Sequence, residues 1–301
     1  MADLPPIGFV GLGMMGWPMA RNLAAAGYPL VVRDADTALQ ERFAVEHGSV
    51  AATAPAAFAE TGVVVTMLPD DKVVQSVVLE WEGGIARALP QGAVVVDMSS
   101  SNPVGTIVLG ERLAPLGIGL VDAPVSGGVL RAESGTLTLM IGGDDEQAIA
   151  RARPVLEVLG ERLFRTGPLG SGHAMKSLNN FVGGATYAVV AEALTVGKRY
   201  GLDPDTMIEV MNASTGRSFN TETVFADHVL TGKYATGFAL GLLAKDVGIA
   251  ASLADTSDVE APICGLVARR WAEAAAVGGA GDHSEAHKYW WNGRLDAGTE
   301  P

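Results

Sequence analysis

The sequence is poor in cysteine, which excludes several kinds of site. Cys264 is the only cysteine among 301 residues, so the chain can form neither an internal disulfide nor a cysteine-based metal cage. Five histidines are scattered along the chain, and only His283 and His287 stand four residues apart. Ser284 occupies the position where a zinc-protease helix needs glutamate. We interpret this histidine pair as a solvated helix end rather than half of a metal site, and we predict no metal.

Positive charge and long apolar runs are also scarce. The chain has 21 Lys and Arg against 34 Asp and Glu, a net charge of -13, which repels nucleic acids and anionic lipid. The least charged stretch, Ser177 to Ala191, contains two asparagines and is too short to span a bilayer. The opening Met-Ala-Asp-Leu-Pro-Pro lacks the basic start of a signal peptide. We expect a cytoplasmic protein without nucleic-acid or membrane partners.

What the sequence does contain, in its first half, is a series of short β-branched runs separated by helical patterns. A hydrophobic content of 48% with 18% charged residues is typical of a globular chain. Short, nearly continuous apolar strands alternating with helices indicate βαβ units in a doubly wound parallel sheet, covered on both faces. The strands are predicted at Ile7–Val10, Leu30–Val32, Val63–Met67, Val94–Met98 and Leu120–Val121.

The second half is predicted to be entirely helical. One helical run extends from His173 to Tyr200 without a charge between Lys176 and Glu192, so we expect it to be buried between domains or subunits. A glycine-rich boundary near Thr166–Gly172 divides the chain into residues 1–168, an α/β dinucleotide-binding domain, and residues 169–301, an all-α domain. Further helices are predicted at Asp205–Ala213, Gly241–Leu253 and Ala261–Ala276, and a loose tail at Asp296–Pro301.

A glycine-rich motif, Gly11-Leu12-Gly13-Met14-Met15-Gly16, follows the first strand and opens a helix. In a dinucleotide-binding turn these glycines make the tight turn, admit the pyrophosphate and pack helix on strand. Asp34 ends the next strand, 18 residues after Gly16, where a carboxylate can accept hydrogen bonds from the adenosine ribose. The alternative is an ordinary turn with Asp34 as a helix cap. Arg33 could hold the 2′-phosphate of NADP, but Asp34 would repel it, so NAD is favoured.

Two further segments follow predicted strands, and both are expected to face a ligand. Leu68-Pro69 and the segment around Ser100 lie at carboxyl ends of parallel strands, where open α/β sheets bind ligands. Asp122-Ala123-Pro124-Val125-Ser126-Gly127-Gly128 places two backbone N–H groups beside a hydroxyl, an arrangement that suits a carboxylate. For either segment the alternative is a plain turn.

The long helix opens with Gly172-His173-Ala174-Met175-Lys176-Ser177-Leu178-Asn179-Asn180. Lys176 and Asn180 are four residues apart and therefore share one face. Alone, Lys176 would be interpreted as a surface lysine. Because it follows a predicted dinucleotide-binding domain and a Ser-Gly-Gly loop in the sequence, it is better interpreted as a general acid/base.

Together these motifs resemble those of the β-hydroxyacid dehydrogenase family, the group of 3-hydroxyisobutyrate dehydrogenase and tartronate semialdehyde reductase, related to 6-phosphogluconate dehydrogenase. The similarity extends from Ile7 to Trp290 and includes a later Ala244-Lys245-Asp246. The resemblance implies a Rossmann domain, a long interdomain helix and an all-helical C-terminal domain that often forms a homodimer or homotetramer. It also implies residue roles: a catalytic lysine at Lys176 with Asn180 as its partner on the substrate, substrate binding by Ser126, Gly127 and Gly128, and cofactor contacts by Leu68, Pro69, Ser100 and Lys245. The family often has threonine where Ser100 stands, which keeps the hydroxyl.

We therefore predict an NAD-dependent dehydrogenase that transfers a hydride between NAD and the hydroxyl carbon of a small β-hydroxy acid. Lys176 exchanges the hydroxyl proton, Asn180 orients the substrate oxygen and the Ser126 loop holds the carboxylate. The alternatives are a reductase of a short semialdehyde, such as tartronate semialdehyde, and a non-catalytic NAD-binding regulator. Arg217, in the second half, could meet a second anionic group of the substrate or form a surface ion pair.

Overall fold

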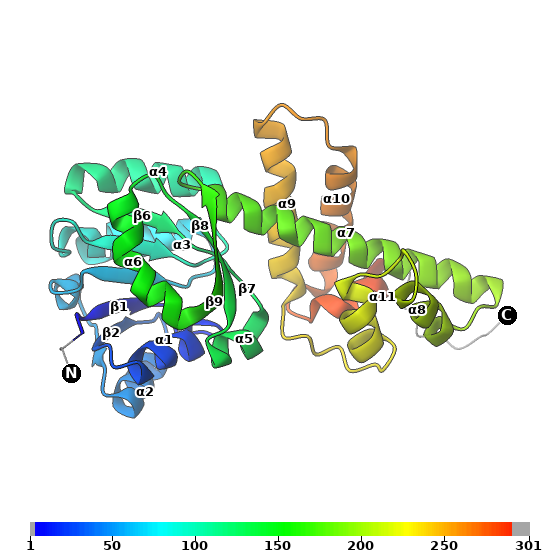
Figure 1. Cartoon of the computed structure of the whole chain (residues 1–301), viewed down its shortest axis with the longest axis horizontal. Helices are drawn as coiled ribbons and strands as arrows, with labels where there is room; N and C mark the ends of the chain where they lie inside the picture. The colour runs from blue at the N-terminus through cyan, green and yellow to red at the C-terminus, as the bar shows by residue number, and fades with distance from the viewer. Residues whose placement is uncertain (1–3, 291–301) are drawn as a thin grey trace. The chain divides into compact units, whose positions relative to one another are not determined.

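The computed structural model describes residues 4–290. It divides the chain into two compact units, Met1–Lys176 and Ser177–Pro301 (Figure 1). The predicted tail at Asp296–Pro301 lies outside the described residues. No helix within residues 4–290 is long and apolar enough to cross a membrane.

The first unit is built on a mixed sheet whose main part is parallel. Strands β3, β2, β1, β4, β5 and β6 lie side by side in that order and are all parallel, which is the order of a doubly wound dinucleotide-binding sheet. β8 continues the sheet antiparallel to β6, and β7 and β9 both pair with β8. The bounds are β1 Ile7–Val10, β2 Leu30–Arg33, β3 Val50–Ala51, β4 Val63–Thr66, β5 Val94–Asp97, β6 Gly119–Asp122, β7 Val125–Ser126, β8 Leu137–Gly142 and β9 Gly160–Gly167.

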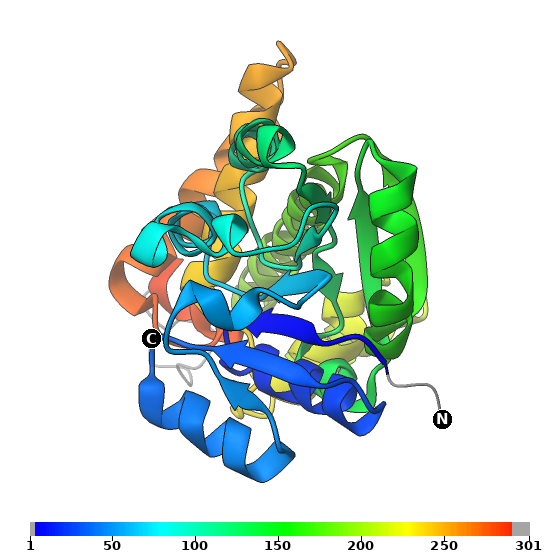
Figure 2. The same ribbon diagram turned by 90° about the vertical axis from the view of Figure 1, so that its left-hand side faces the viewer.

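Helices cover both faces of this sheet (Figures 1 and 2), as the apolar strand runs predict. One apolar core joins the strands to α1 (Gly16–Ala25), α2 (Thr37–His47) and α6 (Glu146–Leu159). The other joins them to α3 (Asp71–Gln75), its π-helical continuation η2 (Ser76–Glu80), and α4 (Pro103–Leu113). Every residue of β1, β4 and β5 is buried, and each buried Val, Ile or Phe side chain contributes about 1.5–3 kcal/mol. The predicted fold class is confirmed.

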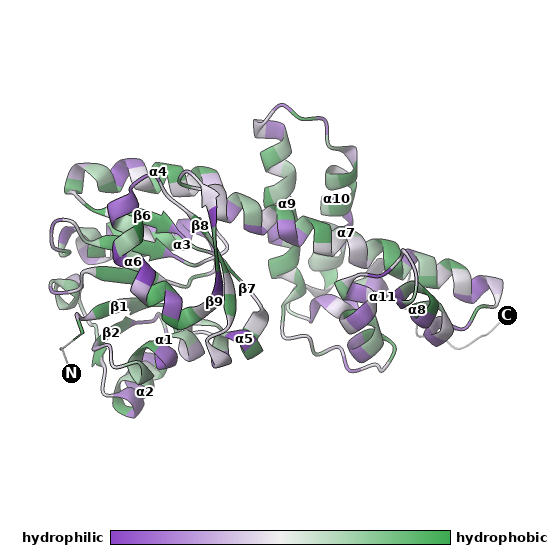
Figure 3. Cartoon of the chain, viewed as in Figure 1, coloured by the Kyte–Doolittle hydropathy of each residue, from purple (hydrophilic) through white to green (hydrophobic). Residues whose placement is uncertain are grey.

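The second unit is helical. Its apolar core surrounds the fully buried Tyr187, Phe225 and Trp271. In Figure 3 the strands of the first unit are mostly green, whereas the helices of both units alternate between green and purple along their length. The helices are α7 Ser171–Tyr200, which begins in the first unit, α8 Pro204–Asn212, the π-helical η6 Asn220–Val229, α9 Leu240–Thr256, α10 Pro262–Gly278 and α11 Ala286–Trp290. Shorter elements are α5 Gly128–Ser134, η1 Pro55–Phe58, η3 Trp81–Gly83, η4 Ile85–Arg87, η5 Ala114–Leu116 and η7 His283–Glu285.

The uncharged stretch of α7, expected to be buried between domains or between subunits, is only partly buried within the single chain: Val182 and Val189 are 62% and 66% exposed. Burial between subunits stays a prediction. One face of the helix packs on the second unit's core through Tyr187, Val190 and Ala191, while the opposite face contacts no other part of that core. Packing within residues 4–290 therefore does not account for the absence of charge on that face.

Candidate active site

The glycine-rich motif forms the turn between β1 and α1. Gly11 adopts a φ of +98°, and a side chain there would collide with the carbonyl oxygen of Met67. A side chain on Gly16 would collide with the carbonyl of Gly11, so this glycine lets the helix approach the turn. At Gly13 an added Cβ meets no atom within 4 Å. Among the described residues no side chain caps the start of α1, so the positive end of its dipole can face an anion. In its first turn the N–H of Trp17 donates to the Gly13 carbonyl at 2.9 Å and Pro18 has no N–H, so the turn before the helix would supply most of the donors.

Asp34 follows β2 directly and contacts the glycine turn. Its carboxylate accepts hydrogen bonds from the backbone N–H of Leu12 at 2.6 Å and of Asp36 at 2.8 Å. Each carboxylate oxygen has a second lone pair, so ribose hydroxyls can still bind there. Arg33 is held elsewhere, because its guanidinium lies 4.8 Å from the ring centroid of Trp81 and donates to Gln40 Oε1 at 3.2 Å.

The loops after β4 and β5 are tied to each other. The backbone N–H of Leu68 donates to Ser99 Oγ at 2.9 Å, and the N–H of Ser99 donates to Asp97 Oδ1 at 3.0 Å. Ser100, next to this buried pair, is half-buried, as is Leu68. The structure therefore places Leu68, Pro69 and Ser100 beyond the carboxyl ends of neighbouring parallel strands, at the same edge of the sheet as Gly11–Gly16.

Ser126 ends β7, where it pairs with Thr138 of β8, and Gly127 and Gly128 follow it into α5. Gly127 has a φ of +132° and Gly128 a φ of +66°, values that side chains rarely adopt. Both glycines are exposed and Ser126 is half-buried. A Cβ added at Gly128 meets no atom within 4 Å, whereas one at Gly127 would meet the side chain of Arg131. The open backbone at Gly128 is compatible with the predicted anion-binding loop.

Lys176 lies on α7, which begins at Ser171, and Asn180 follows one helical turn later. Both side chains are half-buried. In the second unit, Asn180 Nδ2 donates to Asp246 Oδ2 at 2.7 Å, and Asp246 is 1% exposed. Lys245 Nζ lies 3.4 Å from Asp246 Oδ1. The buried carboxylate on α9 therefore fixes the amide of Asn180. Its Oδ1 accepts from Asn179 Nδ2 at 3.3 Å, so one amide hydrogen and the second lone pair of Oδ1 can still face a substrate.

Sequence reasoning missed three buried polar residues, Asp97, Asp122 and His173, and the role of Asp246. All four were visible only as members of motifs. A signal was present for the first two, because an acidic residue directly after a β-branched strand run is costly to bury without donors. Asn180 and Asp246 are 66 residues apart in the sequence, and no local pattern shows that their side chains bond to each other.

The histidine pair and Arg217 lie outside these motifs. His287 is fully buried and the His283 side chain is 12% exposed, so the expectation of a solvated helix end is wrong. Arg217 Nε forms an ion pair with Glu222 Oε1 at 2.6 Å. Of the two predicted alternatives for Arg217, the structure therefore shows the surface ion pair. Within residues 4–290, no three His, Cys, Asp or Glu side chains come together as a metal site would require.

Comparison with known families matches nearly the whole chain. Residues 6–167 match the family described as the NAD binding domain of 6-phosphogluconate dehydrogenase. Residues 170–290 match the family described as NAD-binding of NADP-dependent 3-hydroxyisobutyrate dehydrogenase.

Individual proteins are similar over most of their length. The chain is 36% identical to 2-(hydroxymethyl)glutarate dehydrogenase of Eubacterium barkeri, over 94% of each protein. It is 38% identical to a 3-hydroxyisobutyrate dehydrogenase of Pseudomonas aeruginosa, over 87% of this chain and 89% of the relative. A solved structure of Mycobacterium tuberculosis 3-hydroxyisobutyrate dehydrogenase with L-serine has a TM-score of 0.88 at 30% identity, covering 96% of this chain and 99% of that one.

Proposed function

Because the chain belongs to the β-hydroxyacid dehydrogenase family, we propose that it oxidises a short β-hydroxy acid at its hydroxyl carbon, with Lys176 as the general base. The observation that carries the proposal is the position of Lys176 on α7. The backbone N–H groups at the start of this helix bond to the side chain of Asp122, four residues before Ser126. A proton acceptor and an anion-binding loop thus share one structural anchor in the first unit.

The cofactor is NAD, and the residues of the first unit fit it. The open space at Gly13 and the uncapped start of α1 suit a pyrophosphate, and Asp34 suits the adenosine ribose. We propose that Leu68, Pro69 and Ser100 line the dinucleotide. Lys245 is proposed as a further cofactor contact, as the family resemblance implies. When bound, NAD supplies the acceptor for the hydride.

The remaining chemistry belongs to the chain's own side chains. Ser126, Gly127 and Gly128 hold the substrate carboxylate through a hydroxyl and backbone N–H groups. Asn180 orients the hydroxyl oxygen, and its own orientation is set by Asp246. Neutral Lys176 accepts the hydroxyl proton at Nζ as oxidation proceeds, and in the reverse direction its ammonium returns that proton.

The compounds named for the relatives indicate a substrate class. 3-Hydroxyisobutyrate, L-serine and 2-(hydroxymethyl)glutarate share the unit HOCH2–CHX–COO⁻ and differ only in X. We propose this unit as the substrate core, because the carboxylate needs the Ser126 loop and the primary hydroxyl needs Lys176. The product is then the matching semialdehyde.

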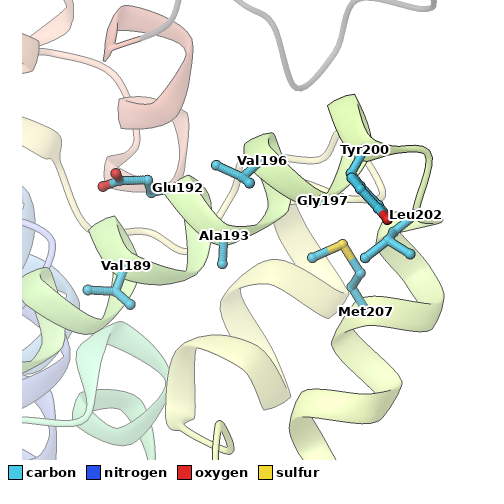
Figure 4. Close-up of a pocket in the computed structure, with 8 residues that line it drawn as sticks. All are labelled: Val189, Glu192, Ala193, Val196, Gly197, Tyr200, Leu202 and Met207. Atoms are coloured by element: carbon cyan, nitrogen blue, oxygen red, sulfur yellow. The ribbon is translucent and has the colours of Figure 1, made fainter.

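We also propose a homodimer or larger homo-oligomer in the cytoplasm. Val182, Val189 and Val196 recur every seven residues on α7 and are 62%, 66% and 64% exposed. Val189 and Val196 also line an apolar groove with Ala193 and Met207, into which Glu192 contributes the one charged side chain (Figure 4). Such an apolar stripe along one helix is typical of a surface that a second copy covers.

The test is NADH formation by the purified chain with a panel of hydroxy acids that share the carboxylate and vary X, with lactate as the control. Lactate carries its hydroxyl on the carbon next to the carboxylate. We expect turnover with at least one HOCH2–CHX–COO⁻ compound and little with lactate. NADH binding without turnover on the whole panel would contradict the proposal and indicate a non-catalytic NAD-binding regulator.

A further inference from the structure

The helix that carries Lys176 is capped by a residue far away in the sequence. Asp122, the last residue of β6, accepts the backbone N–H of Gly170 on Oδ1 at 2.8 Å and that of His173 on Oδ2 at 2.9 Å. These two groups lie at the start of α7, where backbone N–H groups have no partner within the helix. A carboxylate there satisfies them and also interacts favourably with the helix dipole. The start of α7 is therefore fixed to the end of β6.

Two glycines make this close approach possible. A side chain on Gly142 would collide with Asp122 Oδ1, and a Cβ on Gly172 would lie 2.8 Å from Asp122 Oδ2 and would collide with the Met140 carbonyl oxygen. The carboxylate thus sits in a space that accepts no further atoms. The position of the Asp122 carboxylate is therefore restricted both by β8, which contains Gly142, and by α7, which contains Gly172.

His173 extends the connection toward the cofactor side of the sheet. Its ring is fully buried, and Nδ1 lies 2.8 Å from Thr106 Oγ1. Thr106 Oγ1 also lies 3.2 Å from the carbonyl oxygen of Asn102, so its single proton can go to either partner, and the tautomer of His173 sets the direction of the Nδ1 bond. The opposite ring nitrogen, Nε2, lies 3.7 Å from Asp97 Oδ2.

Asp97 completes the chain of contacts. It is 1% exposed and accepts from Thr66 Oγ1 at 2.9 Å, Ser101 Oγ at 2.7 Å and the N–H of Ser99 at 3.0 Å. Ser99 in turn accepts from the N–H of Leu68. Hydrogen bonds therefore join the loops after β4 and β5 to each other, and separately join the end of β6 to the first turn of α7. The contact of 3.7 Å between His173 Nε2 and Asp97 Oδ2 links the two groups.

Burying two carboxylates and an imidazole is costly, and apolar side chains of similar size could fill the same space more cheaply. A network of this kind fixes one geometry, because each bond has a preferred length and direction. His173 lies three residues before Lys176 on the same helix. Proton transfer depends steeply on distance, so a displacement of about 1 Å at the reacting group can cost roughly 100-fold in rate.

We propose that Asp122 and His173 are positioning residues that hold Lys176 at the reacting hydroxyl. The inference rests on the proposed role of Lys176. Neither side chain touches the substrate: both act through the first turn of α7. Asp122 and His173 thus act on the position of Lys176, whereas the hydrogen bonds around Asp97 and Ser99 position the loops after β4 and β5.

The test uses the full-length chain with Asp122→Asn, which leaves one acceptor for two N–H groups, and His173→Asn, which keeps a polar group near the Nδ1 position and loses the ring nitrogen that lies 3.7 Å from Asp97 Oδ2. Thr61→Ala is the matched control, because Thr61 is a fully buried hydroxyl of the same unit that bonds only locally, to the Phe58 carbonyl. We expect kcat to fall about 10–100-fold in the first two variants, with KM and the Kd for NADH within about twofold of the parent. Thr61→Ala should lower Tm and leave kcat unchanged.

The decisive readout is a double-mutant cycle with Lys176→Ala. If Asp122 and His173 act through Lys176, adding either substitution to Lys176→Ala should lower the residual kcat no further. Penalties that multiply in the double variants would overturn the inference, as would an unchanged kcat in both single variants or a loss that follows Tm as in Thr61→Ala. Should Asp122→Asn fail to fold, His173→Asn decides by the same criteria, and if both fail to fold the network is structural and the inference is wrong. A Lys176→Ala variant with normal kcat would instead contradict the proposed function itself.

Discussion

The Asp34 carboxylate bonds both to the glycine turn and to the segment that leads into α2. Its hydrogen bond from the Leu12 N–H at 2.6 Å ties the carboxylate proposed for the adenosine ribose to the turn proposed for the pyrophosphate. Arg33, the one cation that could favour a 2′-phosphate from this strand end, lies over Trp81 and bonds to Gln40. At the residue scale, the preference for NAD over NADP therefore depends on Asp34.

NAD(H) should be used in preference to NADP(H) by about tenfold or more in kcat/KM, since one repulsive polar contact supplies about 1.4 kcal/mol. Asp34→Ser should narrow this preference by removing the charge that repels the 2′-phosphate. Asp36→Ser is the control, because Asp36 caps α2 and serine caps helices as well. Steady-state rates with both cofactors measure the effect. Equal or better turnover with NADPH in the parent protein would mean that Arg33 controls the pocket.

At the scale of elements, the strands with continuous β-branched runs could be predicted because their burial on both faces leaves a clear pattern. β1, β4 and β5 are of this kind. β9 was missed, since half of its eight residues are exposed and, among the described strands, it pairs with β8 alone. The exposed residues are Glu161, Arg162, Phe164 and Arg165. The π-helical η6 was missed because its buried residues do not follow the 3.6-residue period.

The site shows the same division between local and long-range information. The glycine turn and the spacing of Lys176 and Asn180 are local, so the sequence contains them. The cap that Asp122 places on α7 joins residues 48 and 51 positions apart, and only the folded sheet brings them together. The roles of Ser126, Gly127 and Gly128 stay predictions.

The element η7 and the loop before it should make the protein sensitive to acid. Burial lowers the pKa of His283 below its ordinary 6.5, as does the nearby His228, against the opposing effects of Asp282 and the Phe238 carbonyl. Burial alone would raise the pKa of Asp282, but hydrogen bonds from Ser284 and Thr236 outweigh it and lower the pKa below 3.8.

Both shifts act in the same direction. As pH falls below about 6.5, the unfolded chain protonates His283 while the folded chain does not, so the free energy of unfolding decreases; Asp282 adds a further loss below its unfolded pKa of 3.8. Tm measured from pH 7.5 down to pH 5 should therefore fall. His283→Asn, which keeps a donor for Thr236, should flatten this part of the curve. A parent Tm that rises on acidification across this range would contradict the assignment.

At the scale of the whole molecule, the exposed valines of α7 predict self-association. Light scattering at micromolar concentration should report at least twice the 31.1 kDa of the chain. Val189→Glu should shift the protein toward the monomer, because it places a charge in the apolar stripe. Val45→Glu is the matched control: Val45 is 85% exposed, but it lies on α2 in the first unit. A parent protein that scatters as a monomer would show that the stripe is not an oligomer interface.

The central claim is that this chain is a catalyst whose proton acceptor is Lys176, and one comparison tests it most directly. Lys176→Ala should lower kcat for the best hydroxy acid by about 10²–10⁴-fold, the contribution of a positioned general base. The Kd for NADH should barely change, because the dinucleotide is held mainly by the first unit's strand ends. Lys198→Ala, a lysine of the same helix 22 residues farther on, should keep the parent kcat. A folded Lys176→Ala protein that binds NADH and retains near-normal kcat would contradict the account.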